Sequence, residues 1–163
     1  MAGSPDVQNL IELRPMTEPD LDAVVHNEFF AYAFPWIRSI FVECLNAGNE
    51  CWVACIEKDI VGHAVLSIGG GESHLLNVCI SRALQGNGYG RELVLHMLAR
   101  ARRGGADALF LEVRPSNVVA SELYASLGFS EVGLRKDYYP SHLGHEDARV
   151  LVLDLVSGSP NYG

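Results

Sequence analysis

A glycine-rich segment at residues 85–91 has the composition of a phosphate-binding loop. It lies between an apolar stretch and a segment with helical spacing, and it consists of Gln85, Gly86, Asn87, Gly88, Tyr89, Gly90 and Arg91. The first amides of a helix have no partner within the helix and carry a partial positive charge, so they bind phosphate well. Glycine has no Cβ atom, which lets the backbone approach an anion closely. We therefore predict an anion-binding loop, with an ordinary glycine turn before a helix as the alternative.

The spacing of the glycines distinguishes three kinds of nucleotide site. A P-loop would need Gly-Lys followed by Ser or Thr, which the segment lacks. A dinucleotide fingerprint that starts at Gly86 would need a third glycine where the chain has Arg91. The remaining pattern is Gln85-x-x-Gly88-x-Gly90, whose backbone amides suit a pyrophosphate.

Glu112 is a candidate for a catalytic base. It lies inside the apolar stretch formed by residues 109–113, where loss of solvent is expected to raise its pKa toward neutrality. The alternative is an outward-facing strand residue that pairs with Arg114, because residues i and i+2 share a face of a strand.

The four cysteines and six histidines form no metal-binding pattern. Cys44, Cys51, Cys55 and Cys79 include no C-x-x-C pair, and the histidines complete no zinc spacing. Cys51 and Cys55 would share a strand face with Val53, which predicts buried, reduced thiols. We therefore expect no metal ion, and the sequence assigns no role to any histidine.

The hydrophobic pattern predicts one strand, two helices, three strands, a helix, a strand, a helix and two strands. The expected strands are residues 11–14, 51–57, 60–68, 74–80, 108–113, 129–134 and 150–155, and the first two helices are residues 21–30 and 37–45. The later helices are marked by i, i+3, i+4, i+7 spacing at residues 94–101 and 120–127. This order predicts an α/β (α+β) fold with a single mixed, mostly antiparallel sheet of about seven strands and helices on both faces.

Length, composition and charge limit the possible classes of protein. The chain has 163 residues, of which 48% are hydrophobic and 20% charged, so we expect one globular domain over residues 1–163 with frayed tails at 1–9 and 157–163. No signal peptide or membrane span is expected, which favours a cytoplasmic protein. The net charge of −8 argues against direct binding to nucleic acid and is compatible with a basic protein partner.

The chain resembles the GNAT family of N-acetyltransferases. The pyrophosphate loop of that family has the pattern Q/R-x-x-G-x-G/A, which Gln85, Gly88 and Gly90 match. The other matching segments are AYAFPW (31–36), LNVCI (76–80), LEVRPSN (111–117), LYASLGF (123–129), RKDYYP (135–140) and GHEDA (144–148). The chain departs from the family at Gly86, where members often carry an arginine that could reach a phosphate of the cofactor. Within the family, the similarity is to bacterial enzymes that acetylate the N-terminal alanine of a ribosomal protein.

The resemblance implies a GNAT fold and acetyl-CoA as cosubstrate. The backbone of Val78, Cys79 and Ile80 would pair with the pantetheine arm, and residues 85–91 would hold the pyrophosphate, with Arg91 adding charge. Asn117 would bind the arm, although its type and position also suit a helix cap.

The resemblance also implies the catalytic roles. Glu112 would be the base for the incoming amine, and Tyr124, which follows it by 124 − 112 = 12 positions, would protonate the leaving thiolate. Helical spacing alone favours a core aromatic residue at Tyr124. The amine can attack directly, so a covalent relay through Cys79 is not needed.

The implied substrate is a protein N-terminus, that of the eighteenth protein of the small ribosomal subunit. Family loops that grip the peptide are matched by Phe34, Pro35, Trp36, Tyr138 and Tyr139, a set that could also be a packed edge of the core. The alternatives are an acetyltransferase for lysine or a small amine, and an acyl-CoA sensor without turnover.

Overall fold

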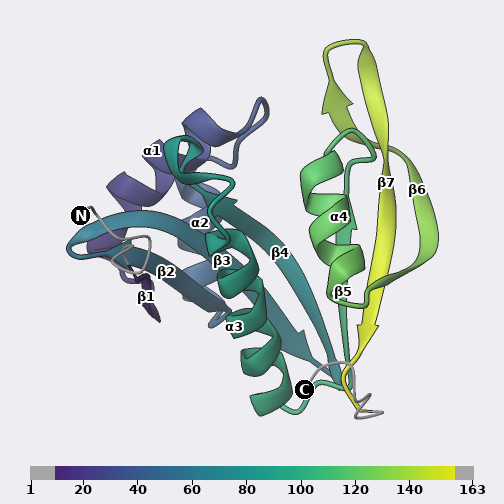
Figure 1. Ribbon diagram of the computed structural model, residues 1–163, viewed down its shortest axis with the longest axis horizontal. Coiled ribbons are helices and arrows are strands. Elements are labelled where there is room, and N and C mark those ends of the chain that lie inside the picture. The colour runs from purple at the N-terminus through teal and green to yellow at the C-terminus, as the bar shows by residue number, and fades with distance from the viewer. Residues whose placement is uncertain (1–9, 157–163) are drawn as a thin grey trace, which may run out of the picture. The chain divides into compact units, whose positions relative to one another are not determined.

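The computed structural model describes residues 10–156, so the tails predicted to fray lie outside the described residues. Figure 1 shows its helices and strands in chain order. The strands are β1 (Glu12–Pro15), β2 (Glu50–Ile56), β3 (Asp59–Gly69), β4 (Glu72–Ile80), β5 (Ala108–Val113), β6 (Ser130–Ser141) and β7 (Gly144–Asp154). The α-helices are α1 (Leu21–Ala31), α2 (Arg38–Asn46), α3 (Tyr89–Arg103) and α4 (Val118–Ser126), with short 3-10 turns η2 (Glu18–Asp20) and η3 (Arg82–Leu84).

The strands form one seven-stranded sheet in the order β1-β2-β3-β4-β5-β7-β6. The pairs β1/β2, β5/β7 and β6/β7 are antiparallel, whereas β4 and β5 run parallel. This confirms the predicted mixed sheet and the predicted order of elements. None of the described helices is long and apolar enough to cross a membrane.

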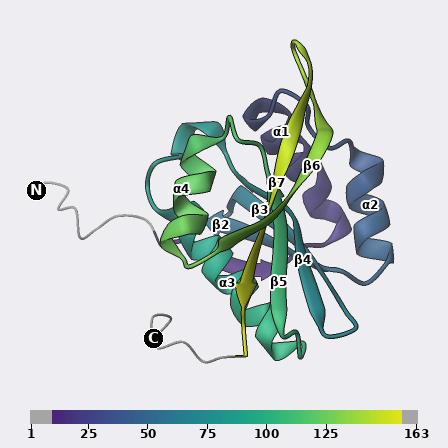
Figure 2. The same cartoon turned by 90° about the vertical axis from the view of Figure 1, so that its right-hand side faces the viewer.

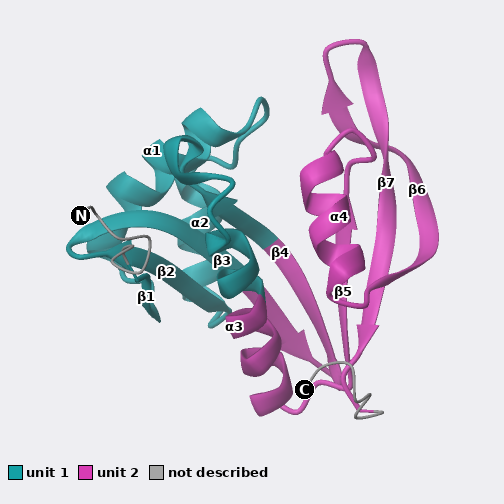
Figure 3. Cartoon of the chain, viewed as in Figure 1, with its two compact units in different colours: residues 1–65, 77–94 teal, residues 66–76, 95–163 magenta. Residues whose placement is uncertain are grey.

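The chain divides into two compact units (Figure 3). Unit 1 comprises residues 1–65 and 77–94, and unit 2 comprises residues 66–76 and 95–163, as far as the structure describes them. The strands β3 and β4 and the helix α3 each contribute residues to both units. The prediction of one domain over the whole chain stays a prediction.

The core of unit 1 lies between the helices α1 and α2 and the strands β2 and β3. The buried face predicted for β2 is confirmed, because Cys51, Val53 and Cys55 all belong to this buried cluster. The start of α3 lies on the other face of the sheet, where Gly90 approaches the side chain of Ile80; Figure 2 shows α1 and α2 together and α3 apart from them. All four thiols are free and buried, and burial raises the pKa of Cys51 to about 12.

An ion pair holds the start of α1 to the edge strand β1. The guanidinium of Arg14 donates two hydrogen bonds of 2.8 Å to the Asp20 carboxylate, which also accepts from the amide and hydroxyl of Thr17. The hydrogen bond from Arg14, opposed by burial and aided by Thr17, lowers the pKa of Asp20 from 3.8 to about 2. Asp20 is 6% exposed, whereas the Arg14 side chain is 42% exposed, so solvent screens part of this interaction.

We predict that Asp20→Asn lowers the free energy of unfolding by about 2 kcal/mol at pH 7. A carboxylate whose pKa is depressed by folding contributes stability above its unfolded pKa, so the difference from wild type should shrink as the pH falls from about 5 toward 2. Urea denaturation of both proteins from about pH 5 to about pH 2 measures this difference in the free energy of unfolding. Asp59→Asn, at an exposed position beside the β2–β3 turn, is the control and should stay within about 0.5 kcal/mol of wild type. A pH-independent loss in Asp20→Asn would contradict the assignment.

The last two strands of unit 2 are longer than the sequence pattern predicts. The segments expected at 129–134 and 150–155 are in fact β6 over Ser130–Ser141 and β7 over Gly144–Asp154. Most of β6 is exposed and its register shifts twice, near Gly133 and before Tyr139. The hairpin is a long twisted ribbon in Figure 2. An exposed, bulged strand needs no apolar alternation, which is why the pattern failed there.

Candidate active site

The glycine-rich loop in unit 1 presents its backbone to open space. Gly86 and Gly88 both have φ of +85°, and no heavy atom lies within 4 Å of a Cβ built on either residue. The amide of Glu92 donates to the carbonyl of Gly88 at 3.2 Å and so connects the loop to the first turn of α3, whose N-terminus carries the partial positive charge of a helix dipole. The Gln85 side chain donates to the carbonyl of Ile80 at 3.0 Å and thereby fixes the loop to the end of β4. This geometry can accept an anion.

The neighbouring part of β4 carries the residues expected to pair with a pantetheine arm. The hydroxyl of Tyr32, between α1 and α2, donates a hydrogen bond to the carbonyl of Val78. Cys79 is buried, and its thiol faces the carbonyl of Asn27 at 3.8 Å. Burial raises the pKa of Cys79 well above that of a free thiol. A neutral, buried thiol is a poor nucleophile, so the geometry gives no support to a covalent relay.

Glu28, on the buried face of α1, connects the loop at residues 34–36 to two strands. Its carboxylate accepts the amide of Trp36 at 3.0 Å, lies 3.0 Å from Nε2 of His63 on β3, and accepts the Asn77 side chain on β4 at 3.2 Å. Glu28 is 2% exposed. Ligand atoms of Glu28, His63 and Cys79 also lie within 4.8 Å of one another, but the carboxylate is already satisfied by hydrogen bonds.

The aromatic residues expected to grip a substrate differ in exposure. Trp36 packs against the unit 1 core, with its ring centroid 5.2 Å from that of Phe41, whereas Phe34 is 40% exposed. In unit 2, Tyr138 is 50% exposed and Tyr139 is partly buried beneath the guanidinium of Arg114. The packed-edge alternative therefore fits Trp36, while Phe34 and Tyr138 are accessible to a partner.

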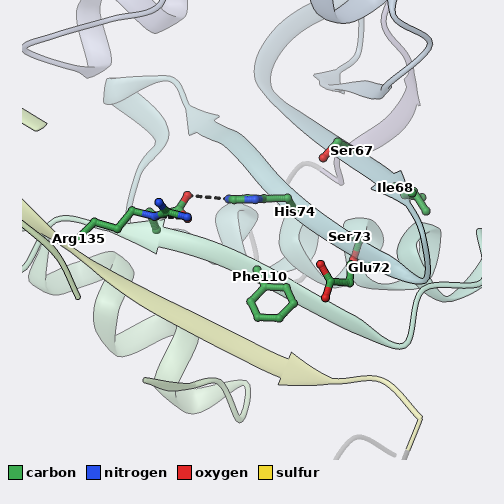
Figure 4. A pocket seen from close by; sticks show the side chains of 9 residues that line it. Ser67, Ile68, Glu72, Ser73, His74, Phe110 and Arg135 are labelled. Carbon is green, nitrogen blue, oxygen red and sulfur yellow. Dashed lines mark hydrogen bonds and ion pairs between the residues drawn. The ribbon is translucent and has the colours of Figure 1, made fainter. Parts of the chain in front are cut away.

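Glu112 in unit 2 lies in an ion pair and not in an apolar pocket. Its Oε1 is 2.6 Å from Nε2 of His74 on β4, and its Oε2 is 3.4 Å from Nε of Arg135 on β6. Figure 4 shows the side chains of His74 and Arg135 reaching toward each other at this point. The alternative partner, Arg114, instead contacts Glu146.

The prediction that desolvation raises the pKa of Glu112 is wrong. Burial alone raises it, but the hydrogen bond and charge of His74, together with Arg135, lower the pKa below its ordinary value of 4.5. Glu112 is therefore ionised throughout the neutral range.

Tyr139 interacts electrostatically with Glu112 and with Tyr124. Tyr124, on α4, is 4% exposed and packs its ring edgewise on Phe129. Burial raises its pKa, and Tyr139 adds to the effect. The pKa of Tyr139 is raised by burial and then by the charge of Glu112. The phenol of Tyr124 therefore remains protonated at neutral pH and can donate a hydrogen bond.

The loop after β5 is fixed by Glu146 on β7. The Glu146 carboxylate accepts the amide and hydroxyl of Ser116 at 2.9 and 3.0 Å and contacts Arg114 at 3.4 Å. Hydrogen bonds from Ser116 lower the pKa of Glu146. Asn117 caps α4, accepting the amide of Ala120 at 3.2 Å. The capping interpretation of Asn117 is thus confirmed, and its contact with a cofactor stays a prediction.

Sequence reasoning missed Glu28, His74 and Arg135. Glu28 left a signal, because it follows Leu21 and Val24 on the buried face of α1, and a charge on an apolar face predicts a buried partner. His74 and Arg135 left none, because their approach to Glu112 depends on the parallel pairing of β4 with β5 and on the packing of β6.

Comparisons with known proteins show which proteins the chain is similar to. The family model described as "Acetyltransferase (GNAT) family" matches residues 10–129. The [ribosomal protein bS18]-alanine N-acetyltransferase of Escherichia coli K12 is 35% identical over 138 residues, which cover 83% of this chain and 92% of the relative. The enzyme of the same name from Haemophilus influenzae is 37% identical over 136 residues, covering 82% and 90%.

A solved structure shows the same arrangement of the chain. The crystal structure of the ribosomal-protein-S18-alanine N-acetyltransferase from Escherichia coli matches with a TM-score of 0.84 at 32% identity, covering 90% of this chain and 94% of that chain. These matches confirm the predicted fold and the enzyme class, an N-acetyltransferase. Because the family model and the relatives each match most of its length, the chain belongs to the acetyltransferase (GNAT) family.

Proposed function

We propose that this enzyme transfers the acetyl group of acetyl-CoA to the α-amine of a protein N-terminus, specifically the N-terminal alanine of ribosomal protein bS18. The substrate rests on one observation, the similarity along most of both chains to relatives that carry this name. A ribosomal substrate implies a cytoplasmic location, and the net charge of −8 suits a basic partner.

The residues of unit 1 fit the cosubstrate. The loop at residues 85–91 offers left-handed Gly86 and Gly88 beside open space at the start of α3, an arrangement suited to a pyrophosphate. The loop binds through backbone amides, so the missing arginine at Gly86 removes one charge but not this mode of binding. Backbone groups of Val78, Cys79 and Ile80 would hold the pantetheine arm, and Asn117 of unit 2 would contribute its side chain.

Unit 2 supplies the two groups proposed for proton transfer. Glu112 is ionised and accepts a proton from the incoming ammonium, directly or through a water molecule. The neutral amine then attacks the thioester carbonyl. Tyr124, which stays protonated, donates a hydrogen bond to the leaving thiolate and completes the transfer as CoA departs. Since burial raises the pKa of Tyr124 above that of a free phenol, early protonation of the thiolate is disfavoured.

An exposed aromatic surface in unit 1 supports a peptide as acceptor. Large hydrophobic side chains that remain 38–62% exposed gather at the end of α1 and in the following loop, namely Phe29, Phe30, Tyr32, Phe34 and Ile37. Exposed apolar patches of this kind mark surfaces that bind a partner. The hydrogen bond from the Trp36 amide to Glu28 fixes this loop. Tyr138 and Tyr139 are proposed to contribute from the β6–β7 hairpin.

The chemistry also favours an N-terminal amine over lysine. A free α-amine has a pKa of about 7.7–8.0, against about 10.4 for lysine. A base of low pKa such as Glu112 therefore removes a proton from the α-ammonium at a much smaller cost in free energy than from a lysine ammonium. Among the alternative functions, lysine acetylation would require Glu112 to deprotonate an ammonium of higher pKa. An acyl-CoA sensor would need neither Glu112 nor Tyr124.

Three acceptors incubated with acetyl-CoA and analysed by mass spectrometry test the proposal. They are an Ala-initiated bS18 peptide, the same peptide with a blocked N-terminus and an internal lysine, and a small polyamine. We expect acetylation at the free α-amine, with CoA released at a steady rate. Equal rates for the blocked peptide would contradict the N-terminal assignment, and cofactor binding without CoA release would favour the sensor.

A further inference from the structure

The short loop between α1 and α2, which we call the acceptor loop (residues 32–36), is attached at both of its ends. At its first residue, the hydroxyl of Tyr32 donates a hydrogen bond to the carbonyl of Val78 on β4. At its last residue, the backbone amide of Trp36 donates to the carboxylate of Glu28 on α1 at 3.0 Å. Displacing the loop would therefore break at least one of these two hydrogen bonds.

The attachment at Glu28 leads to the same part of β4. Its carboxylate accepts the side-chain amide of Asn77, the residue before Val78, at 3.2 Å to each oxygen, and lies 3.0 Å from Nε2 of His63 on β3. Both attachments of the acceptor loop thus end at two consecutive residues of β4, inside unit 1. Glu28 is 2% exposed, so a hydrogen bond lost there is not readily replaced by one to water.

Between the two attachments, the acceptor loop presents an exposed aromatic side chain. Phe34 is 40% exposed, and Pro35 restricts the backbone φ angle beside it. The ring of Trp36 packs on Phe41 of the unit 1 core, with 5.2 Å between the ring centroids. A loop that is fixed in this way before its partner arrives loses little conformational entropy when it binds.

We propose that Glu28 and Tyr32 are positioning residues, which fix the acceptor loop to β4 and thereby lower the KM for the acceptor peptide. This inference rests on the proposed function, in which Phe34 and its neighbours bind the peptide. Without the two attachments, part of the free energy of peptide binding is used to order the loop. The KM for the peptide therefore rises, whereas kcat at saturating peptide is kept, because the bound complex has the same arrangement.

Replacing Glu28 with methionine removes the acceptors of the Trp36 and Asn77 amides and keeps a side chain of similar length. We expect the KM for the bS18 peptide to rise about tenfold or more, with kcat and the Kd for acetyl-CoA within about twofold of wild type. Glu28→Gln is the conservative variant. It retains one oxygen that can accept the Trp36 amide, so its KM should lie between those of wild type and Glu28→Met.

Replacing Tyr32 with phenylalanine removes the other attachment by deleting the hydroxyl alone. Tyr32 is 38% exposed, so water can partly replace its hydrogen bond to the carbonyl of Val78. We therefore expect a smaller rise in the KM for the peptide, of about threefold, again with kcat kept. Steady-state kinetics with varied peptide at saturating acetyl-CoA measure all three variants.

Asp20→Asn is the matched control, because it weakens buried hydrogen bonds of unit 1 without touching the acceptor loop. It should lose stability and keep the wild-type KM for the peptide. A folded Glu28→Met with a wild-type KM, or with a lowered kcat and an unchanged KM, would overturn the positioning role. If Glu28→Met does not fold, the same criterion is applied to Tyr32→Phe.

Hydrogen exchange followed by mass spectrometry separates this inference from the proposed function. The acceptor loop, with the amide of Trp36, should exchange faster in Glu28→Met than in wild type, whereas Asp20→Asn should leave its exchange unchanged. Unchanged protection of residues 32–36 in Glu28→Met would overturn the attachment, whichever amine is the acceptor. A wild type that does not acetylate the bS18 peptide contradicts the proposed function alone, and the exchange data then decide the attachment.

Discussion

Replacing Glu112 with glutamine is expected to lower kcat by at least about tenfold, and by as much as about 10²–10⁴-fold, while the affinity for acetyl-CoA changes little. Glutamine keeps the size of the side chain but cannot accept the proton of the ammonium. The deficit should be largest at or below pH 7 and should diminish above about pH 8, where the α-amine loses its proton without help. Steady-state measurement of CoA release with the bS18 peptide, together with calorimetry of acetyl-CoA binding, checks both parts.

The lowered pKa of Glu112 determines the pH range in which its protonation can affect kcat. A depressed pKa means that the carboxylate is neutralised only when the pH falls below its ordinary value of 4.5, so an acidic limb near neutrality does not report Glu112 itself. Tyr124→Phe should lower kcat by a factor similar to that of Glu112→Gln, and by the same factor at every pH near neutrality, because burial keeps the phenol protonated.

Glu131→Gln is the matched control for the glutamate. Glu131 is an exposed residue of unit 2 that pairs with Arg149, and its replacement should leave kcat within about twofold of wild type. Near-normal kcat in both Glu112→Gln and Tyr124→Phe would remove the catalytic assignment and leave the binding loop untouched.

Gly88→Val should weaken acetyl-CoA binding severely, by at least about tenfold in Kd. The φ of +85° at Gly88 lies in the left-handed region, where a β-branched residue is strained by about 1–3 kcal/mol. If the valine shifts the loop out of this conformation, the backbone amides are misaligned. If the loop keeps its conformation, the valine side chain occupies the open space where the anion would lie. Isothermal titration calorimetry measures the change.

Gly48→Val separates loss of binding from loss of stability. Gly48 has a φ of +77° and open space around a Cβ, as Gly88 does, but it lies in the turn between α2 and β2. Both variants should lose stability to a similar degree, and only Gly88→Val should lose affinity. An unchanged Kd in a folded Gly88→Val would refute the loop assignment.

Local spacing in the sequence determined the features that depend on neighbouring residues. The glycine-rich turn before α3 and the buried face formed by Cys51, Val53 and Cys55 were both predicted and are found. Backbone conformation, capping and alternation act over a few residues, so the residue types themselves carry the information. The resemblance to a family supplied the expected roles of Glu112 and Tyr124, which local spacing could not distinguish from a surface charge and a core aromatic residue.

Only the tertiary structure decided the electrostatics of the candidate site. Burial in an apolar strand predicted a raised pKa for Glu112, yet His74, which is 38 residues away in sequence, and Arg135 from another strand reverse the shift. In the same way, Glu28 joins Trp36, His63 and Asn77 from three elements. A pKa is set by the charges within a few ångströms, and strand pairing determines which charges those are. The sequence by itself therefore determined which groups are available for chemistry, and the packing of the strands decided their charge states and their partners.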